Sequence, residues 1–334
     1  MVSDTTLQSP AFCIDSSYSM RNALSIEAPC KINLHLRVKG RRTDGFHELE
    51  SIFLALAAGD TLHFELGENG KGDEFLVQDS AELPRENNIV LKAVNLFRAR
   101  TGFDAPLRIR LEKRIPLGAG LGGGSSDGAS TLLALNELAG RMGRSPVLDG
   151  DALRRLAAEL GSDVPFFLGA SGAAFVTGRG EHIRPIEGPP DCGVVLVKPG
   201  FSSNTADAFR LLDAHRLDAE APGDIAGLSE WALVEALKGP PARWPYRNDF
   251  LEVFLAKGAP AERDMYRAIL GDLQEAGADF CGLTGSGSTC FGIFTGGGGG
   301  PAGTAEKAKK ALSRPEFFTL LTFPLARLGN AVVK

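Results

Sequence analysis

The feature that most constrains this chain is a glycine-rich segment, Pro116-Leu-Gly-Ala-Gly-Leu-Gly-Gly-Gly-Ser-Ser126, which runs into a stretch rich in Ala and Leu. Glycines allow successive backbone N–H groups to approach phosphate oxygens without a Cβ in the way. The helix predicted to follow, from about Ser126 to Ala139, adds unpaired N–H donors and the positive end of its dipole. Ser125 and Ser126 can supply hydroxyl groups. The segment therefore predicts an anion-binding loop suited to a triphosphate.

Three alternatives exist for this segment. A flexible hinge is one, but the segment lies between a predicted strand and a strong helix, where disorder is costly. Gly118, Gly120 and Gly123 formally match the dinucleotide fingerprint GxGxxG. That fingerprint belongs directly after a strand, whereas Lys113-Arg-Ile-Pro116 intervenes here and no acidic strand end follows about 20 residues on. A P-loop needs a lysine after its glycines, and none occurs between Gly118 and Ser126.

Length and charge limit the remaining classes of protein. At 334 residues the chain exceeds what one hydrophobic core usually serves, so two domains are expected. Apolar residues make up 43% and charged residues 23%, which is typical of a globular protein rather than a disordered one. The formal net charge of −5 argues against nucleic acid as the main partner, because binding to a phosphate backbone needs a positive surface.

Cysteine and histidine usage indicates neither a disulfide framework nor a zinc site. The five cysteines are odd in number and lack CxxC spacing, and the five histidines lack HExxH spacing. Free thiols in a reducing compartment are expected. No stretch reaches the roughly 18 apolar residues of a membrane span, and residues 1–24 lack the basic start and apolar middle of a signal peptide. We predict a flexible tail over residues 1–24 and a cytoplasmic protein with no membrane partner.

Periodicity predicts strands and helices that alternate in two lobes. Residues 31–38 alternate apolar and polar side chains, the period of a half-buried strand. Asn88 can cap a helix, and Gly161 is expected to end another in the left-handed conformation. Strands are predicted over residues 31–38, 51–56, 60–66, 107–111 and 194–197, and helices over residues 89–100, 126–139, 151–160 and 263–276. An α+β arrangement with a cleft between two lobes is the economical interpretation.

Three segments, in this order along the chain, resemble the GHMP kinase superfamily, which includes galactokinase and the homoserine, mevalonate and phosphomevalonate kinases. The first is Ala28-Pro-Cys-Lys-Ile-Asn-Leu34, the second is the loop Pro116–Ser126, and the third is Leu283-Thr-Gly-Ser-Gly-Ser-Thr-Cys-Phe291. The chain is therefore similar to a group of small-molecule kinases.

Two further segments make the resemblance narrower. Gly40-Arg-Arg-Thr-Asp-Gly-Phe-His47 and Gly161-Ser-Asp-Val-Pro165 resemble the 4-diphosphocytidyl-2-C-methyl-D-erythritol kinase family, and the similarity covers roughly residues 25–330. This resemblance implies ATP-dependent phosphorylation of the 2-hydroxyl group of that alcohol, a step of non-mevalonate isoprenoid precursor synthesis. It also implies ATP and Mg²⁺ as cofactors and a small-molecule partner rather than a nucleic acid.

The resemblance implies a specific α+β fold. An N-terminal domain like domain 2 of ribosomal protein S5 is expected over residues 25–185, and a ferredoxin-like C-terminal GHMP kinase domain over residues 190–334. The active site is expected between them. Whether the protein is a monomer or a homodimer stays open.

Phosphoryl transfer asks a protein for positioning and charge stabilisation, and a carboxylate near the acceptor hydroxyl is useful as a base. Asp163 is predicted to be that base, because the family's catalytic aspartate lies in this segment. Lys31 matches the family's lysine, and a cation beside Asp163 would keep the carboxylate ionised and stabilise the attacking oxygen. The plain alternatives are a turn-forming aspartate before Pro165 and a solvent-facing strand lysine.

Acceptor recognition is predicted from four positions. Asn33 is expected to position the acceptor or Asp163. Phe46 and His47 correspond to the family's cytosine-recognition pair, and Phe46 replaces the usual tyrosine, which keeps the stacking surface but removes a phenol hydroxyl. Phe209 is a possible second stacking ring, although a core aromatic is a comparable explanation.

The remaining site residues concern the phosphates. The resemblance assigns ATP binding to every residue of the glycine-rich segment (Pro116, Leu117, Gly118, Ala119, Gly120, Leu121, Gly122, Gly123, Gly124, Ser125 and Ser126) and to Asn88 and Lys113. It assigns the acceptor's phosphates to Gly285, Gly287 and Ser288, whose alternative is an ordinary tight hairpin. No magnesium ligand is identified.

Other functions remain possible at this point. Another GHMP kinase, acting on mevalonate, phosphomevalonate or homoserine, is one alternative, and the Asp44-Gly-Phe-His47 element argues against it. A silent nucleotide- or RNA-binding protein with the S5-like fold is a second. A nicotinamide-dependent dehydrogenase is a distant third.

Overall fold

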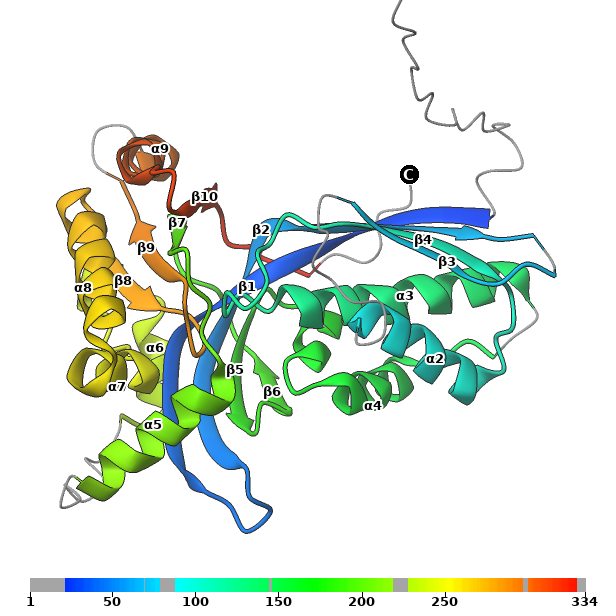
Figure 1. The fold of residues 1–334 in the computed structure, drawn as a ribbon, viewed down its shortest axis with the longest axis horizontal. Coiled ribbons are helices and arrows are strands. Elements are labelled where there is room, and N and C mark those ends of the chain that lie inside the picture. Colours follow the sequence, from blue (N-terminus) through cyan, green and yellow to red (C-terminus); the bar gives the residue numbers. More distant parts are fainter. Residues whose placement is uncertain are drawn as a thin grey trace, which may run out of the picture.

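The structure of the protein is a computed structural model that describes residues 22–68, 70–78, 88–143, 146–218, 228–296 and 300–328. The predicted tail over residues 1–24 falls mainly outside these residues, and β1 already begins at Ala23. Two lobes are visible, each with its own sheet and helices (Figure 1).

The N-terminal lobe is a six-stranded sheet with helices on one side (Figure 1). Its strands are β1 (Ala23–Arg41), β2 (His47–Leu66), β3 (Glu74–Gln78), β4 (Leu107–Glu112), β5 (Ala173–Gly178) and β6 (His182–Pro185). Its helices are α2 (Ile89–Thr101), α3 (Gly123–Met142) and α4 (Gly150–Leu160), with the 3-10 helix η2 (Val164–Leu168). The order is β3-β4-β2-β5-β6, and β1 pairs with β2.

The pair β1 and β2 forms a long antiparallel ribbon that extends through both lobes (Figure 1). The sequence predicted two strands where β2 is one, and Gly59 explains the difference. A Cβ on Gly59 would lie 2.2 Å from the carbonyl oxygen of Ala28, so only glycine lets the strands stay this close. The register shifts between Pro29 and Cys30, beside this contact, and the ribbon continues past it.

The C-terminal lobe has a four-stranded antiparallel sheet in the order β10-β7-β9-β8. Its strands are β7 (Gly193–Lys198), β8 (Phe280–Leu283), β9 (Cys290–Phe294) and β10 (Phe318–Thr322). Its helices are α5 (Thr205–Asp218), α6 (Glu230–Ala236), α7 (Asp249–Lys257), α8 (Pro260–Glu275) and α9 (Gly300–Leu312), with the 3-10 helix η3 (Pro241–Arg243). Helices connect β7 to β8 and β9 to β10, and this order confirms the predicted ferredoxin-like arrangement.

A shared hydrophobic core joins the two lobes. Ile32 of β1 and Leu54 of β2 belong to the same buried cluster as Leu196 of β7 and Phe291 of β9. Residues 323–327, after β10, return to the N-terminal lobe, where the Leu325 amide donates to the Ala55 carbonyl oxygen at 2.9 Å. The contact between the lobes is therefore a packed interface beside the cleft.

Two local predictions were wrong. The helix predicted from about residue 126 begins at Gly123, because Gly122 takes a left-handed conformation and the chain turns into the helix directly after it. Gly161 ends α4 with a φ of 166°, which is extended backbone rather than left-handed. The Asn88 cap of α2 is confirmed, since its side chain accepts a hydrogen bond from the Val90 amide.

Candidate active site

The glycine loop (Pro116–Ser126) connects β4 to α3 and is held from two sides. Gly118, Gly120 and Gly122 have φ values of 61°, 75° and 68°, which favour glycine. A Cβ on Gly120 would lie 2.4 Å from the carbonyl oxygen of Thr284, and one on Gly122 would lie 3.0 Å from the Lys31 side chain. The loop therefore fits tightly between the second lobe and β1, and the plain hinge interpretation does not apply.

A cavity of about 400 Å³ lies along this loop. It is lined by Asn88, Ile89, Leu111, Lys113, Pro116, Leu117, Gly118, Ala119, Gly120, Leu121, Gly122, Gly123, Gly124, Ser125 and Asp127. The structure thus brings together the predicted nucleotide-binding residues with one exception, Ser126. The Ser126 side chain is buried outside the cavity lining, and its hydroxyl has no hydrogen-bond partner among the described residues.

Lys31 and Asp163 form an ion pair at the loop, with Nζ and Oδ2 3.1 Å apart. The Lys31 side chain is buried, whereas a third of the Asp163 side chain is exposed. The Lys31 ammonium also donates to Asn33 Oδ1 at 2.7 Å and lies 4.5 Å from the centre of the Phe53 ring. The Lys31 amide donates to the Leu121 carbonyl oxygen at 2.9 Å, which places the pair directly against the glycine loop.

Asp163 is held by the chain on both sides of it. It lies between Gly161, at the end of α4, and η2, whose Val164, Phe166 and Phe167 are buried in the core. Gly180, in the turn between β5 and β6, approaches it closely, since a Cβ there would lie 3.6 Å from Asp163 Oδ1. The carboxylate is therefore anchored by its backbone and open at its tip.

Asn33 links the two lobes. Its Oδ1 accepts from the Gly285 amide at 3.0 Å, and its Nδ2 donates to Ser51 Oγ at 2.9 Å. Its own amide donates to Thr284 Oγ1 at 3.0 Å. The same Oδ1 accepts from the Lys31 ammonium, so the Asn33 side chain fixes that ammonium relative to the second lobe.

The second-lobe turn (Thr284–Ser288) meets the glycine loop. Thr284 Oγ1 donates to the Gly120 carbonyl oxygen at 3.1 Å, and Gly285 and Gly287 have φ values of 56° and 91°. The Ser288 hydroxyl is buried and donates to the Phe201 carbonyl oxygen at 2.7 Å, so it supports the chain segment rather than pointing into the cleft.

Two residues that the sequence did not indicate hold these elements in place. Asn248, the cap of α7, donates to the carbonyl oxygens of Leu283 at 2.7 Å and Gly285 at 3.0 Å. Ser202, after β7, packs against Gly118, where a Cβ would lie 3.1 Å from its side chain. Neither residue stands in a glycine-rich motif, so no sequence signal marked them.

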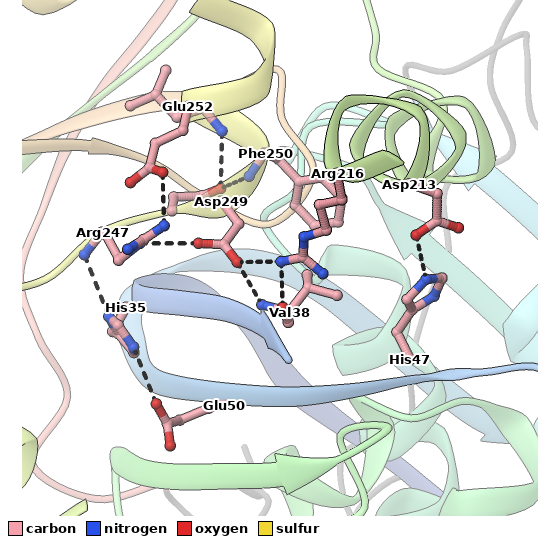
Figure 2. Close-up of polar contacts among 12 residues, drawn as sticks. His35, Val38, His47, Glu50, Asp213, Arg216, Arg247, Asp249, Phe250 and Glu252 are labelled. Carbon is pink, nitrogen blue, oxygen red and sulfur yellow. Dashed lines mark hydrogen bonds and ion pairs between the residues drawn. The ribbon is translucent and has the colours of Figure 1, made fainter. Parts of the chain in front are cut away.

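The predicted cytosine-recognition residues lie at the β1–β2 hairpin (residues 38–48). Phe46 is 53% exposed, and the Arg179 guanidinium lies 4.7 Å from its ring centre. His47 Nε2 lies 2.9 Å from Asp213 Oδ1 of α5, as Figure 2 shows. The His47 ring stacks on Phe209 with centroids 4.6 Å apart. Phe209 therefore supports His47 in this structure, and its role as a second ring that stacks on the cytosine stays a prediction.

A buried carboxylate, Asp249, ties this hairpin to the second lobe (Figure 2). Its Oδ2 accepts from the Val38 amide at 2.9 Å and lies 3.0 Å from Arg216 of α5. Its Oδ1 lies 3.0 Å from Arg247. Asp249 is the first residue of α7, where a negative charge also complements the helix dipole. The sequence analysis missed this residue.

Glu50 stands at the base of the same hairpin, 3.7 Å from His35 Nε2 (Figure 2). Its carboxylate also lies 2.7 Å from Lys39 Nζ. Burial alone would raise the pKa of Glu50, but the interactions with His35 and Lys39 outweigh it and lower the pKa to about 2. Glu50 is therefore ionised at any ordinary pH.

Lys113 is buried between two carboxylates. Its Nζ lies 2.5 Å from Asp60 Oδ2 and 2.9 Å from Asp127 Oδ2. Burial raises the pKa of Asp127 to about 7, although the Lys113 charge opposes the shift. Lys113 lines the cavity as predicted, but its ammonium group is occupied by these partners. Asp60 and Asp127 were not predicted.

Within the described ranges, no group of three or more His, Cys, Asp or Glu side chains is arranged to hold a metal ion. In the same part of the chain, no helix is long and apolar enough to cross a membrane.

Comparisons with known proteins agree with this geometry. Residues 88–171 match the GHMP kinases N terminal domain, and residues 231–315 match the GHMP kinases C terminal domain. The chain is 37% identical over 283 residues to the 4-diphosphocytidyl-2-C-methyl-D-erythritol kinase of Protochlamydia amoebophila (strain UWE25). The aligned region covers 85% of this chain and 87% of that protein. It is 40% identical over 275 residues to the kinase of the same name from Anaeromyxobacter sp. (strain K), covering 81% and 80%. A crystal structure of 4-(cytidine 5'-diphospho)-2C-methyl-D-erythritol kinase superposes with a TM-score of 0.69 at 31% identity, over 90% of this chain and 99% of that one.

Proposed function

The chain belongs to the 4-diphosphocytidyl-2-C-methyl-D-erythritol kinase family, and we propose that its cleft transfers the γ-phosphoryl group of ATP to the 2-hydroxyl group of that alcohol. The products are the 2-phosphate and ADP, within non-mevalonate isoprenoid precursor synthesis. The observation that carries the proposal is the Lys31–Asp163 pair beside the cavity of the glycine loop.

The nucleotide is proposed to bind in the cavity along the glycine loop. The positive φ values of Gly118, Gly120 and Gly122 keep Cβ atoms away from the phosphates, and α3 begins at Gly123 with unpaired N–H groups. Ser125, on the cavity wall, can add a hydroxyl donor. Magnesium is proposed to arrive as the MgATP complex and to neutralise phosphate charge, since triphosphates in water normally carry it.

Asp163 is the proposed general base. A third of its side chain is exposed, so a carboxylate oxygen can accept the proton of the alcohol's hydroxyl group. The Lys31 ammonium, 3.1 Å from that carboxylate, is placed to stabilise negative charge on the attacking oxygen. Asn33, which receives the Lys31 ammonium, positions it relative to both lobes.

The acceptor's cytosine is proposed to stack on the exposed ring of Phe46, while His47, held by Asp213 and Phe209, presents its edge to the base. The second-lobe turn, with Gly285 and Gly287, offers backbone groups to the acceptor's phosphates. Ser288 contributes through its support of this turn.

The test is ADP release from MgATP with and without 4-diphosphocytidyl-2-C-methyl-D-erythritol, for wild type and Asp163→Asn. We expect acceptor-dependent release that falls by roughly 100- to 10,000-fold in the variant, the range for loss of a general base. Asp264→Asn, at an exposed position on α8, is the matched control and should behave as wild type. Undiminished turnover by a folded Asp163→Asn protein would refute the base assignment.

An acceptor panel separates the remaining alternatives. Preference for mevalonate, phosphomevalonate or homoserine would refute the cytidine reading while keeping the kinase. Silence with every acceptor, together with salt-sensitive RNA binding, would favour a non-enzymatic protein. The cytoplasmic location and the choice between monomer and homodimer stay predictions.

A further inference from the structure

Asp60, Lys113 and Asp127 form a buried charged cluster behind the glycine loop. They come from β2, from the residue after β4 and from the first turns of α3, which places the cluster at both ends of the loop. The exposed fractions of the three side chains are 0%, 7% and 3%. One ammonium group faces two carboxyl groups, so the fully ionised cluster carries one uncompensated negative charge.

The two carboxyl groups are not equivalent. Asp60 Oδ1 accepts from the amides of Arg114 at 2.6 Å and Ile115 at 2.8 Å, and its Oδ2 receives Lys113. Asp127 Oδ2 receives Lys113, but its Oδ1 is buried with no hydrogen-bond partner among the described residues. A buried, unpartnered carboxylate oxygen is costly, whereas a neutral carboxyl group in the same place costs much less.

The cluster also lies where it meets the ligand. Lys113 and Asp127 both line the cavity in which the nucleotide is proposed to bind. Ser126, the residue before Asp127 in α3, has a buried hydroxyl with no hydrogen-bond partner among the described residues. Phosphates on the glycine loop bring several negative charges to a partly enclosed site. Their repulsion by an ionised Asp127 would be strong because little solvent screens it.

We propose that binding of a nucleotide's phosphates on the glycine loop is coupled to uptake of one proton by Asp127. An O–H bond forms on the Asp127 carboxyl group, the proton comes from solvent, and the cluster becomes neutral as the phosphates arrive. This inference rests on the proposed function, because it needs a nucleotide in the cavity.

The surroundings of Asp127 support this coupling. The charged groups that act on it are Lys113, from the segment after β4, and Asp60, from β2. From α2, the neutral side chains of Asn88 and Ile89 face the same cavity. Burial already places the pKa of Asp127 at about 7 in the free protein, so bound phosphates would raise it further into the range above neutrality.

The sign of the pH dependence follows. Below about pH 6 Asp127 is neutral with or without nucleotide, and binding takes up no proton. Between about pH 7 and pH 9 the free protein loses the proton and the complex regains it, so nucleotide affinity falls as the pH rises. The limit for one proton per nucleotide is about tenfold in affinity per pH unit.

The experiment is isothermal titration of the full chain with ADP and a non-hydrolysable ATP analogue at pH 8, in two buffers of different ionisation enthalpy. The dependence of the binding heat on the buffer gives the number of protons taken up. Wild type should take up several tenths of a proton more than Asp127→Asn, and the ionisation of the nucleotide itself cancels in that difference. Asp104→Asn, at an exposed position, is the control and should match wild type.

Affinity supplies a second readout that a merely structural role for Asp127 would not produce. Asp127→Asn should bind ADP more tightly than wild type at pH 8.5 and equally at pH 6, because it carries no charge to neutralise. Should this variant fail to fold, infrared difference spectra of wild type keep the question open to test: the band of a protonated carboxyl group must grow when ADP is added at pH 8.

Equal proton uptake by wild type and Asp127→Asn, or the absence of that infrared band, overturns the coupling alone. If folded wild type binds no nucleotide at all, the proposed function fails, and the coupling fails with it.

Discussion

The glycine loop and the β1–β2 hairpin contribute to the same cleft but are held by different kinds of contact. The loop is one continuous segment, and backbone groups fix it: the Ala119 carbonyl oxygen accepts from the Thr289 amide, and the Leu121 carbonyl oxygen accepts from the Lys31 amide. The hairpin is fixed by side chains from far along the chain. His47 reaches Asp213, and Asp249 reaches the Val38 amide.

This difference has consequences for tolerance to mutation. Adding any side chain at a crowded glycine should disrupt the glycine loop, and the loss should appear in nucleotide binding. Removing single side-chain pairs from the hairpin should weaken acceptor binding in small steps. The predictions below test this contrast from the largest expected effect to the smallest.

The largest effect is expected from Gly120→Ala. The new Cβ would lie 2.4 Å from the Thr284 carbonyl oxygen, at a φ of 75° that alanine disfavours. We expect a loss of at least about 100-fold in kcat/KM for ATP, equivalent to about 3 kcal/mol. Steady-state kinetics and nucleotide titration measure it. Gly271→Ala, on α8 with nothing within 4 Å of its Cβ, is the control and should leave activity unchanged. A Gly120→Ala enzyme with normal ATP kinetics would show that the loop is not held as described.

Asp249→Ala should be next. Removal of this buried carboxylate leaves the Val38 amide without its partner and two arginines without a shared charge. We expect a loss of about 3 kcal/mol in the free energy of unfolding and a rise of about tenfold in the acceptor KM, while nucleotide affinity stays within about twofold. Denaturant unfolding and separate titrations of the two substrates measure these quantities. Equal losses for both substrates would mean that Asp249 does not act on the hairpin in particular.

Glu50 gives a pH-dependent test on the same side of the cleft. Its pKa is lowered from 4.5 to about 2, so its contribution to stability is complete above about pH 4.5 and is lost as the pH falls toward 2. Over this interval the free energy of unfolding of wild type should therefore fall by about 2–3 kcal/mol more than that of Glu50→Gln. Urea unfolding between pH 2 and pH 7 measures the difference. Parallel curves for the two proteins would contradict the lowered pKa. The pKa of Asp127, on the nucleotide side of the cleft, is shifted in the opposite direction by burial, which raises it.

The same contrast explains what the sequence could predict. The glycine loop, the Lys31 motif and the Asp163 segment are local patterns, and the structure brings them together as expected. The Asn88 cap was likewise predictable from the local pattern. The loop, the two motifs and the cap depend on residues close together in the chain, whereas the ferredoxin-like order was expected only from the resemblance to the kinase family.

What could not be predicted depends on contacts across long sequence separations. Asp60 meets Lys113 across 53 residues, and Asp249 meets Val38 across 211 residues. Nothing in the local sequence of an aspartate reveals whether it will be buried opposite a lysine or exposed to water. The continuity of β2 past Gly59 has the same cause, because it depends on the approach of Ala28 from β1.

The smallest effect, and the sharpest test of the hairpin, is expected from Asp213→Asn. The contact between His47 Nε2 and Asp213 Oδ1 is 2.9 Å long, and the Asp213 side chain is 39% exposed, so solvent screens the pair. We expect the acceptor KM to rise about three- to fivefold with unchanged kcat and unchanged ATP kinetics, which corresponds to about 1 kcal/mol. Asp207→Asn, one turn and a half earlier on α5 and 59% exposed, is the matched control. A selective change in acceptor KM would mean that α5 orients His47 for the cytosine, because asparagine keeps the shape of the Asp213 side chain and removes only its charge. A change in ATP kinetics of the same size would instead mean that α5 acts on the whole cleft, through the segment before it that packs on Gly118.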